Sequence, residues 1–95
     1  MGGRCKGGDA LELGQVVLTK NAADKLKQEE VRDVLNRYIN KDWGELDKED
    51  WEANDHALEN NGRILASYSL DENRKVWIIT EWDRSATTIL LPEDY

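Results

Sequence analysis

The sequence contains little that could hold a small protein together through covalent bonds or a metal ion. Its 95 residues include one cysteine, one histidine, one proline and no phenylalanine. The single cysteine, Cys5, excludes an internal disulfide and favours a reducing, cytoplasmic setting. One cysteine and one histidine are too few ligands for a structural zinc site, and no glycine-rich phosphate loop follows a predicted strand. We therefore predict neither a metal nor a cofactor.

Long apolar runs and an excess of basic residues are also missing. No stretch approaches the roughly 18 residues of a membrane span, so we expect no membrane association. The net charge of −7 is opposite in sign to that of a generic nucleic-acid binder, so we expect no direct nucleic-acid binding. The glycine-rich residues Met1–Ala10 are interpreted as a flexible leader, followed by a single domain over residues 11–95.

The negative charge is concentrated in one segment. Residues 42–59 contain a single base, Lys48, and these acids: Asp42, Glu45, Asp47, Glu49, Asp50, Glu52, Asp55 and Glu59. One interpretation is a solvated helix with Asp47 as its N-cap. The other is an acidic surface that imitates DNA phosphates. The segment lacks the spacing and central glycine of a calcium-binding EF-hand loop.

Apolar periodicity predicts helices in the first two-thirds of the chain. The apolar positions at helical spacing are Leu26, Val31, Val34, Leu35, Tyr38 and Ile39. We expect a helix that begins at Ala22 with Thr19 or Asn21 as its cap, breaks near Gln28 and ends near Asn40. A further helix should follow Asp47 and end at Asn60-Asn61-Gly62 with a left-handed residue.

The last third predicts three antiparallel strands, over Arg63–Leu70, Val76–Thr80 and Thr87–Leu91. A loop at Asp71–Asn73, with Asn73 in the left-handed conformation, places Tyr68 opposite Val76 and Ala66 opposite Ile78. A loop at Asp83–Ala86 places Thr80 opposite Ile89 and Ile78 opposite Leu91. Gly14–Thr19 is a candidate short strand at an edge. The fold class is α+β, with two to three N-terminal helices packed on a three-stranded antiparallel meander.

Both faces of this predicted sheet are apolar. The first collects Ile64, Ala66, Tyr68, Val76, Ile78, Ile89 and Leu91, and the second collects Leu65, Trp77, Ile79 and Leu90. The helices can cover one face, so the second needs cover from elsewhere in this chain or from another molecule. An uncovered apolar patch marks an interface, and we therefore predict a protein partner or a homodimer.

Several runs resemble one family of small proteins. These are Asp42-Trp43-Gly44, then Gly62–Tyr68 (GRILASY), Val76–Glu81 (VWIITE), Asp83-Arg84-Ser85 and Thr87–Tyr95 (TTILLPEDY). They are similar to proteins of roughly a hundred residues carried by plasmids, phages and integrative elements, usually labelled plasmid-related or hypothetical. The likeness covers residues 14–95 and is most specific in the last third. Members usually have Thr-Pro where this chain has Thr19-Lys20, which bears only on where the first helix begins. The resemblance implies a mobile-element accessory protein and supplies no known active site.

The densest polar cluster lies on the last predicted hairpin and comprises Asp83, Arg84, Ser85, Thr87 and Thr88. It is either ordinary turn chemistry or a recognition loop in which Arg84 grips a phosphate or carboxylate. If the protein is an enzyme, the candidate residues for binding phosphate or transferring a proton are Arg63, Arg74, Arg84 and His56. His56 lies among polar residues, and no nucleophile is found at a spacing typical of catalysis.

These observations favour a non-enzymatic protein-interaction module of a mobile genetic element. Its binding surface would be the second sheet face or the Asp83–Thr88 hairpin. An acidic inhibitor of host defence, of the anti-restriction or anti-CRISPR kind, is the alternative that residues 42–59 support. A small ribonuclease-like toxin is the third, although such enzymes are generally basic and this chain is not.

Overall fold

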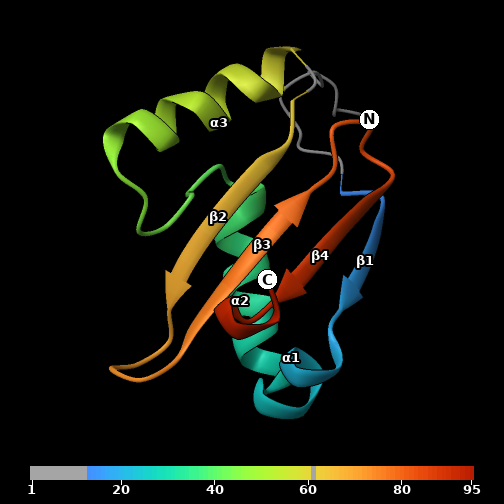
Figure 1. Ribbon diagram of the computed structural model, residues 1–95, viewed down its shortest axis with the longest axis vertical. Coiled ribbons are helices and arrows are strands. Elements are labelled where there is room, and N and C mark those ends of the chain that lie inside the picture. Colours follow the sequence, from blue (N-terminus) through green and yellow to red (C-terminus); the bar gives the residue numbers. More distant parts are fainter. Residues whose placement is uncertain (1–12, 61) are drawn as a thin grey trace.

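A computed structural model describes residues 13–60 and 62–95, so the leader predicted over Met1–Ala10 lies outside the described residues. The fold is α+β, with helices in the first two-thirds and most strands in the last third (Figure 1). The elements, in chain order, are β1 (Gln15–Leu18), α1 (Lys20–Lys25), α2 (Gln28–Ile39), α3 (Lys48–Asn60), β2 (Ile64–Ser69), β3 (Lys75–Thr80), β4 (Ala86–Leu90) and the 3-10 turn η2 (Pro92–Asp94).

The first two helices follow the predicted pattern closely. Thr19 is the N-cap of α1, and its hydroxyl accepts a hydrogen bond from the backbone N–H of Ala22 at 3.2 Å. The helix therefore begins at Lys20, two residues before the predicted start. Leu26 adopts an extended conformation, which ends α1 and confirms the predicted break before Gln28. The predicted end near Asn40 is also confirmed, because α2 ends at Ile39.

The third helix begins after Asp47 and ends at Asn60, as the sequence predicts, although neither Asn60 nor Gly62 adopts the predicted left-handed conformation. Its first turn is capped by Asp47, whose carboxylate accepts a hydrogen bond from the N–H of Asp50 at 2.9 Å. At the other end, the N–H of Gly62 donates to the carbonyl of Ala57 at 3.0 Å. The buried side of α3 is narrow, consisting of Asn54 and Ala57 with Trp51 and Leu58 partly buried beside them.

In the part of the chain that the structure describes, the sheet has four strands in the order β1-β4-β3-β2. Strands β2, β3 and β4 form the predicted antiparallel meander, and β1 is the candidate fourth strand, added parallel to β4. The sheet is therefore mixed, rather than a purely antiparallel three-stranded meander. In the β2–β3 pair, Tyr68 lies opposite Val76 and Ala66 opposite Ile78, as predicted.

Two details of the hairpins were predicted wrongly. Ile78 lies opposite Ile89 and Thr80 opposite Thr87, two residues from the predicted pairing, because the loop is Trp82–Ser85 and Glu81 pairs with Ala86. Asn73 does not adopt the left-handed conformation. Instead, the carboxylate of Asp71 accepts hydrogen bonds from the N–H groups of Asn73 and Arg74 and closes that loop.

The core lies between the helices and the first face of the sheet. Because the register error is an even number of residues, every side chain keeps its predicted face. The residues of the predicted first face are all buried: Ile64, Ala66, Tyr68, Val76, Ile78, Ile89 and Leu91. Helix α2 lies behind the sheet in Figure 1, and α1 lies below the ends of β1 and β4. These two helices supply Ala22, Val34 and Tyr38 to the same core.

Candidate functional site

The second face of the sheet is partly covered by the C-terminal residues of the chain. Trp77 is half-buried, and the ring of Tyr95 meets it edge-on with 5.4 Å between ring centroids. Ile79 and Leu90, which were predicted for this face, are buried. Leu65 is 38% exposed and Tyr95 is 71% exposed. The second face therefore combines a covered centre with accessible apolar positions around it.

Strand β1 extends this face by one strand. The β1–β4 register places Val17 next to Thr88, so Val17 shares the face of Leu90 and Trp77. Its side chain is 41% exposed. Sequence reasoning did not find Val17 or Tyr95, because neither the parallel pairing nor the return of the C-terminal turn can be read from apolar alternation. We call Val17, Leu65, Trp77 and Tyr95 the second-face patch.

Arg84 of the predicted recognition hairpin is engaged with the backbone of other elements. Its guanidinium donates to the carbonyls of Gly62 at 2.7 Å, Ala57 at 3.0 Å and Glu81 at 3.1 Å. The carbonyl of Ala57 lies in the last turn of α3, where helix carbonyls lack partners within the helix. Arg84 itself has a φ of 61°. Its side chain therefore ties the hairpin to the end of α3.

The other members of the hairpin cluster point in different directions. Asp83 and Ser85 are exposed, and hydrogen bonds from the hydroxyl and N–H of Ser85 hold the pKa of Asp83 below its ordinary value. Thr87 is fully buried on the first face, whereas Thr88 lies on the second. The five residues that are neighbours in the sequence therefore do not form one polar cluster in the structure.

Thr87 belongs to a buried chain of hydroxyl groups. The hydroxyl of Tyr38 lies 2.6 Å from that of Thr80, which lies 2.9 Å from that of Thr87. Thr87 donates to the carbonyl of Leu13 at 2.7 Å. Burial raises the pKa of Tyr38 to about 12, so this phenol retains its proton at neutral pH. The chain links α2, β3, β4 and the segment before β1.

Half of the predicted acidic surface has partners within the fold. Asp47 caps α3, and Asp42 pairs with Arg37 at 2.9 Å, a hydrogen bond that lowers the pKa of Asp42. Glu45 accepts a hydrogen bond from the hydroxyl of Ser69, and Asp55 accepts one from the indole of the buried Trp43. The remaining acids are exposed on α3: Glu49, Asp50, Glu52 and Glu59.

Among the described residues, no hydrogen bond joins the candidate enzyme residues to one another, although Arg84 binds the carbonyls of Ala57 and Gly62, which adjoin His56 and Arg63 in the sequence. Arg74 pairs with Glu30 and Asp71, both at 2.8 Å, on the α1–α2 side of the molecule. His56 lies near Asn60 on the exposed side of α3. Within residues 13–60 and 62–95, no three His, Cys, Asp or Glu side chains are grouped to hold a metal ion. No helix in the same ranges is long and apolar enough to cross a membrane.

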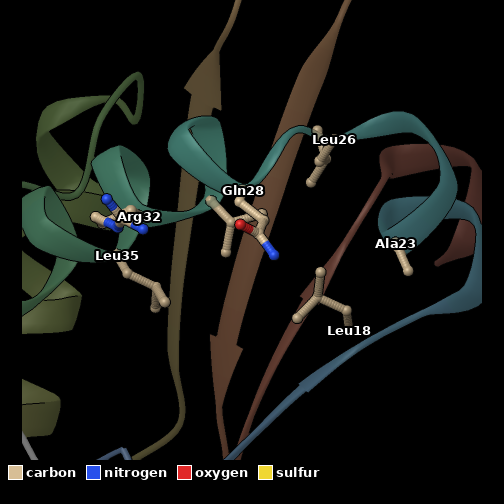
Figure 2. A pocket seen from close by; sticks show the side chains of 7 residues that line it. Leu18, Ala23, Leu26, Gln28, Arg32 and Leu35 are labelled. Atoms are coloured by element: carbon tan, nitrogen blue, oxygen red, sulfur yellow. The ribbon is translucent and has the colours of Figure 1, made fainter.

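An open apolar groove lies between β1 and the first two helices, with a volume of about 520 Å³. Figure 2 shows Leu18 of β1 on one side of it and Leu35 and Arg32 of α2 on the other. Leu26, Ala23, Gln28 and Val31 complete its lining. Sequence reasoning missed this groove, since it depends on where β1 docks relative to α2.

Comparisons of the chain with protein-family models, curated proteins and solved structures find no match. The resemblance to mobile-element proteins therefore stays a prediction from the sequence.

Proposed function

We propose that this chain is a non-enzymatic protein-binding module of a mobile genetic element, and that the second-face patch is its binding surface. The observation that carries the proposal is the aromatic pair of half-buried Trp77 and exposed Tyr95 on a sheet face that α1 and α2 do not cover. Leu65 and Val17 flank the pair on β2 and β1. The assignment to a mobile element depends on the sequence resemblance alone.

The composition of the patch is typical of a protein-binding surface. Aromatic residues are enriched at the centre of protein interfaces, where charged residues are depleted. A sheet also presents such side chains in a fixed arrangement, which reduces the entropy lost on binding. The partner should accordingly present an apolar surface.

Three of the polar residues predicted as candidates for catalysis or recognition make their contacts within the fold. Arg74 pairs with two carboxylates, Arg84 binds three carbonyls, and Thr87 is buried in the hydroxyl chain. A guanidinium that already donates to protein acceptors would have to give up those bonds to hold a phosphate. Binding through apolar side chains requires no such exchange.

The experiment is affinity capture of partners from host lysate with the full chain and two variants. Leu65→Ser removes an accessible member of the patch, and Glu59→Gln changes an exposed residue on α3 as the control. We expect one or more proteins to be retained when salt is raised from about 0.05 M to about 0.5 M, because apolar contacts are not screened. Those proteins should be lost with Leu65→Ser and kept with Glu59→Gln. Equal capture by both variants would contradict the assignment of the surface.

An acidic inhibitor of host defence remains the second candidate, on the exposed acids Glu49, Asp50, Glu52 and Glu59 of α3. Binding to a basic groove through these residues should weaken steeply as salt rises, and should weaken with Glu59→Gln rather than Leu65→Ser. The same capture experiment therefore separates the two functions.

A further inference from the structure

The two edge strands of the sheet, β1 and β2, differ in whether other residues bond to their outer backbone groups. At the β2 edge, the side-chain amide of Asn54 bonds to both the carbonyl and the N–H of Leu65, at 2.7 and 3.2 Å. Beside it, Ser67 accepts a hydrogen bond from the N–H of Glu45 and donates its own N–H to the carbonyl of Trp43. This edge therefore has the outer backbone groups of Leu65 and Ser67 paired within the chain, which is a protection against strand addition.

At the opposite edge, β4 is the only strand of residues 13–60 and 62–95 that pairs with β1. The N–H groups of Gln15 and Thr19 donate to the carbonyls of Ser85 and Ile89, both at 3.1 Å. Because the direction of these groups alternates along a strand, the backbone groups of Val16 and Leu18 point away from β4. β1 thus presents its outer donors and acceptors at the margin of the sheet.

The side chains of this edge are apolar on both faces. Val16 and Leu18 align with Thr87 and Ile89 and so lie on the first face, where Leu18 lines the open groove. Val16 is 39% exposed. Val17 lies on the second face. A strand added to β1 would place alternate side chains over the groove, which is how strand-addition sites combine backbone bonds with pockets.

We propose that the strand added to β1 is β1 of a second copy of this chain, in antiparallel orientation about a two-fold axis at Val17. In this register, Val16 of each copy lies opposite Leu18 of the other. Both residues have outward backbone groups, so each such pair exchanges its two hydrogen bonds. Val17 then lies opposite its own counterpart, and β-branched pairs of this kind stabilise a sheet. The interface is isologous and closes on itself.

The apolar side chains of the β1 edge are complementary to those of a second copy. Val16 of each protomer, opposite Leu18, would enter the groove that Leu18, Val31 and Leu35 line in the other. Leu18 would cover the exposed Val16 in return. β1 thus supplies both the side chain that fills the groove of the partner copy, Val16, and a side chain that lines the groove, Leu18.

The distribution of charge also favours self-association at this edge. Residues 13–35 carry four bases and four acids and are neutral overall: Lys20, Lys25, Lys27 and Arg32 against Asp24, Glu29, Glu30 and Asp33. The acidic helix α3 packs against β2, at the far edge of the sheet. Two copies joined at β1 would therefore meet through neutral surfaces and keep their acidic segments apart, which limits repulsion between two chains of charge −7.

The first test is sedimentation equilibrium of the full chain over a wide concentration range, with Val16→Pro and Val16→Lys. Proline at position 16 removes an N–H that points away from β4, so it leaves the β1–β4 hydrogen bonds in place. Lysine adds a charge to the edge, which opposes strand pairing. We expect a dimer that both variants weaken at least about tenfold in Kd, while Leu65→Ser leaves it unchanged. A wild-type monomer at all concentrations, or a dimer that both variants retain, would overturn the proposal.

The second test fixes the register by disulfide formation in a Cys5→Ser background. Val17→Cys places two thiols opposite each other in a non-hydrogen-bonded antiparallel pair, a geometry that a disulfide can bridge. Ser67→Cys is the control, because Ser67 lies on β2 at the opposite edge of the sheet. We expect mild oxidation to link Val17→Cys chains into dimers and to leave Ser67→Cys chains unlinked. Equal cross-linking of both would overturn the register. Val17 belongs to both surfaces, but the first test changes only Val16, and the capture experiment changes Leu65 and not the β1 edge, so the proposed function and the dimer can fail separately.

Discussion

At the scale of single residues, the buried hydroxyl chain has a defined direction. The carbonyl of Leu13 can only accept, so Thr87 must donate to it. The hydroxyl of Thr80 must then donate to Thr87, and Tyr38 to Thr80. Each hydroxyl proton has one acceptor, and among the described residues no buried side-chain N or O atom lacks a partner.

This direction predicts unequal costs for two conservative substitutions. Tyr38→Phe removes the first donor, and all remaining protons keep their acceptors, so we expect a loss of about 0.5–1.5 kcal/mol in the free energy of unfolding. Thr80→Val removes the acceptor of the Tyr38 proton and leaves a buried donor unpaired, for which we expect about 1–3 kcal/mol. Urea unfolding monitored by tryptophan fluorescence measures both. An equal or reversed order of the two losses would contradict the direction assigned to these hydrogen bonds.

At the scale of elements, the segment between α2 and α3 is joined to the β2 edge through Gly44. Its φ is +80°, and a Cβ built there would overlap the carbonyl of Ser67 and lie 2.7 Å from Cδ1 of Tyr68. Only glycine allows the backbone to approach the edge strand this closely. The buried Trp43 immediately before it depends on the same approach, since its carbonyl accepts the N–H of Ser67.

We therefore expect Gly44→Ala to lower the free energy of unfolding by about 3 kcal/mol, from the strained φ and the displaced edge contact. Gly62→Ala is the matched control, because Gly62 has no left-handed φ and an added Cβ would meet Ala57, at 3.0 Å from its Cβ and 3.4 Å from its Cα. Its loss should be clearly smaller. Thermal unfolding of both variants gives the comparison, and equal losses would contradict the role assigned to Gly44.

Local patterns were sufficient to predict most elements, and long-range contacts explain what they missed. The β2–β3 register follows from the Asp71–Asn73 loop, whose bonds are all local. The β3–β4 register was wrong because Arg84 takes a left-handed conformation while binding carbonyls of Ala57 and Gly62, far back along the chain. No local rule assigns that conformation to arginine.

The candidate sites were predicted less well for the same reason. Leu65 and Trp77 were found because strand alternation identifies the face of a residue. Tyr95 and Val17 complete the patch through the C-terminal turn and the parallel β1–β4 pair, and neither arrangement has a periodic signature. Similarly, an excess of acids is visible in the sequence, but the partners of Asp42 and Asp55 are not.

At the scale of the whole molecule, the carboxylate of Asp94 joins the two ends of the described chain. It accepts hydrogen bonds from the hydroxyl of Thr19 and the amide of Asn21, both at 2.7 Å. The hydroxyl of Thr19 is also the cap of α1. These bonds hold the pKa of Asp94 below its ordinary value of 3.8, with the Thr19 bond as the main cause.

The lowered pKa predicts a loss of stability in acid. A carboxyl with a folded pKa below its unfolded pKa contributes stability that is present above about pH 4 and is lost as the pH falls through the folded value. The pKa of Asp42, lowered by Arg37, acts in the same direction. We expect the urea concentration at the midpoint of unfolding to decrease as the pH is lowered below about 4. The decrease should be less steep in Asp94→Asn. A midpoint in Asp94→Asn with the same pH dependence as wild type would contradict this role.

The parallel pairing of β1 with β4 also has a consequence for how the chain reaches its native state. Gln15 aligns with Ala86, so this pair closes a loop that contains most of the chain. Closing such a loop costs conformational entropy. This cost is compensated only when the contacts between β1 and β4 form together. The meander, whose strands are joined by short loops, should therefore form early, with β1 docking late. Until then β4 is itself the margin of the sheet, and the time spent in that intermediate is when the chain is most exposed to aggregation.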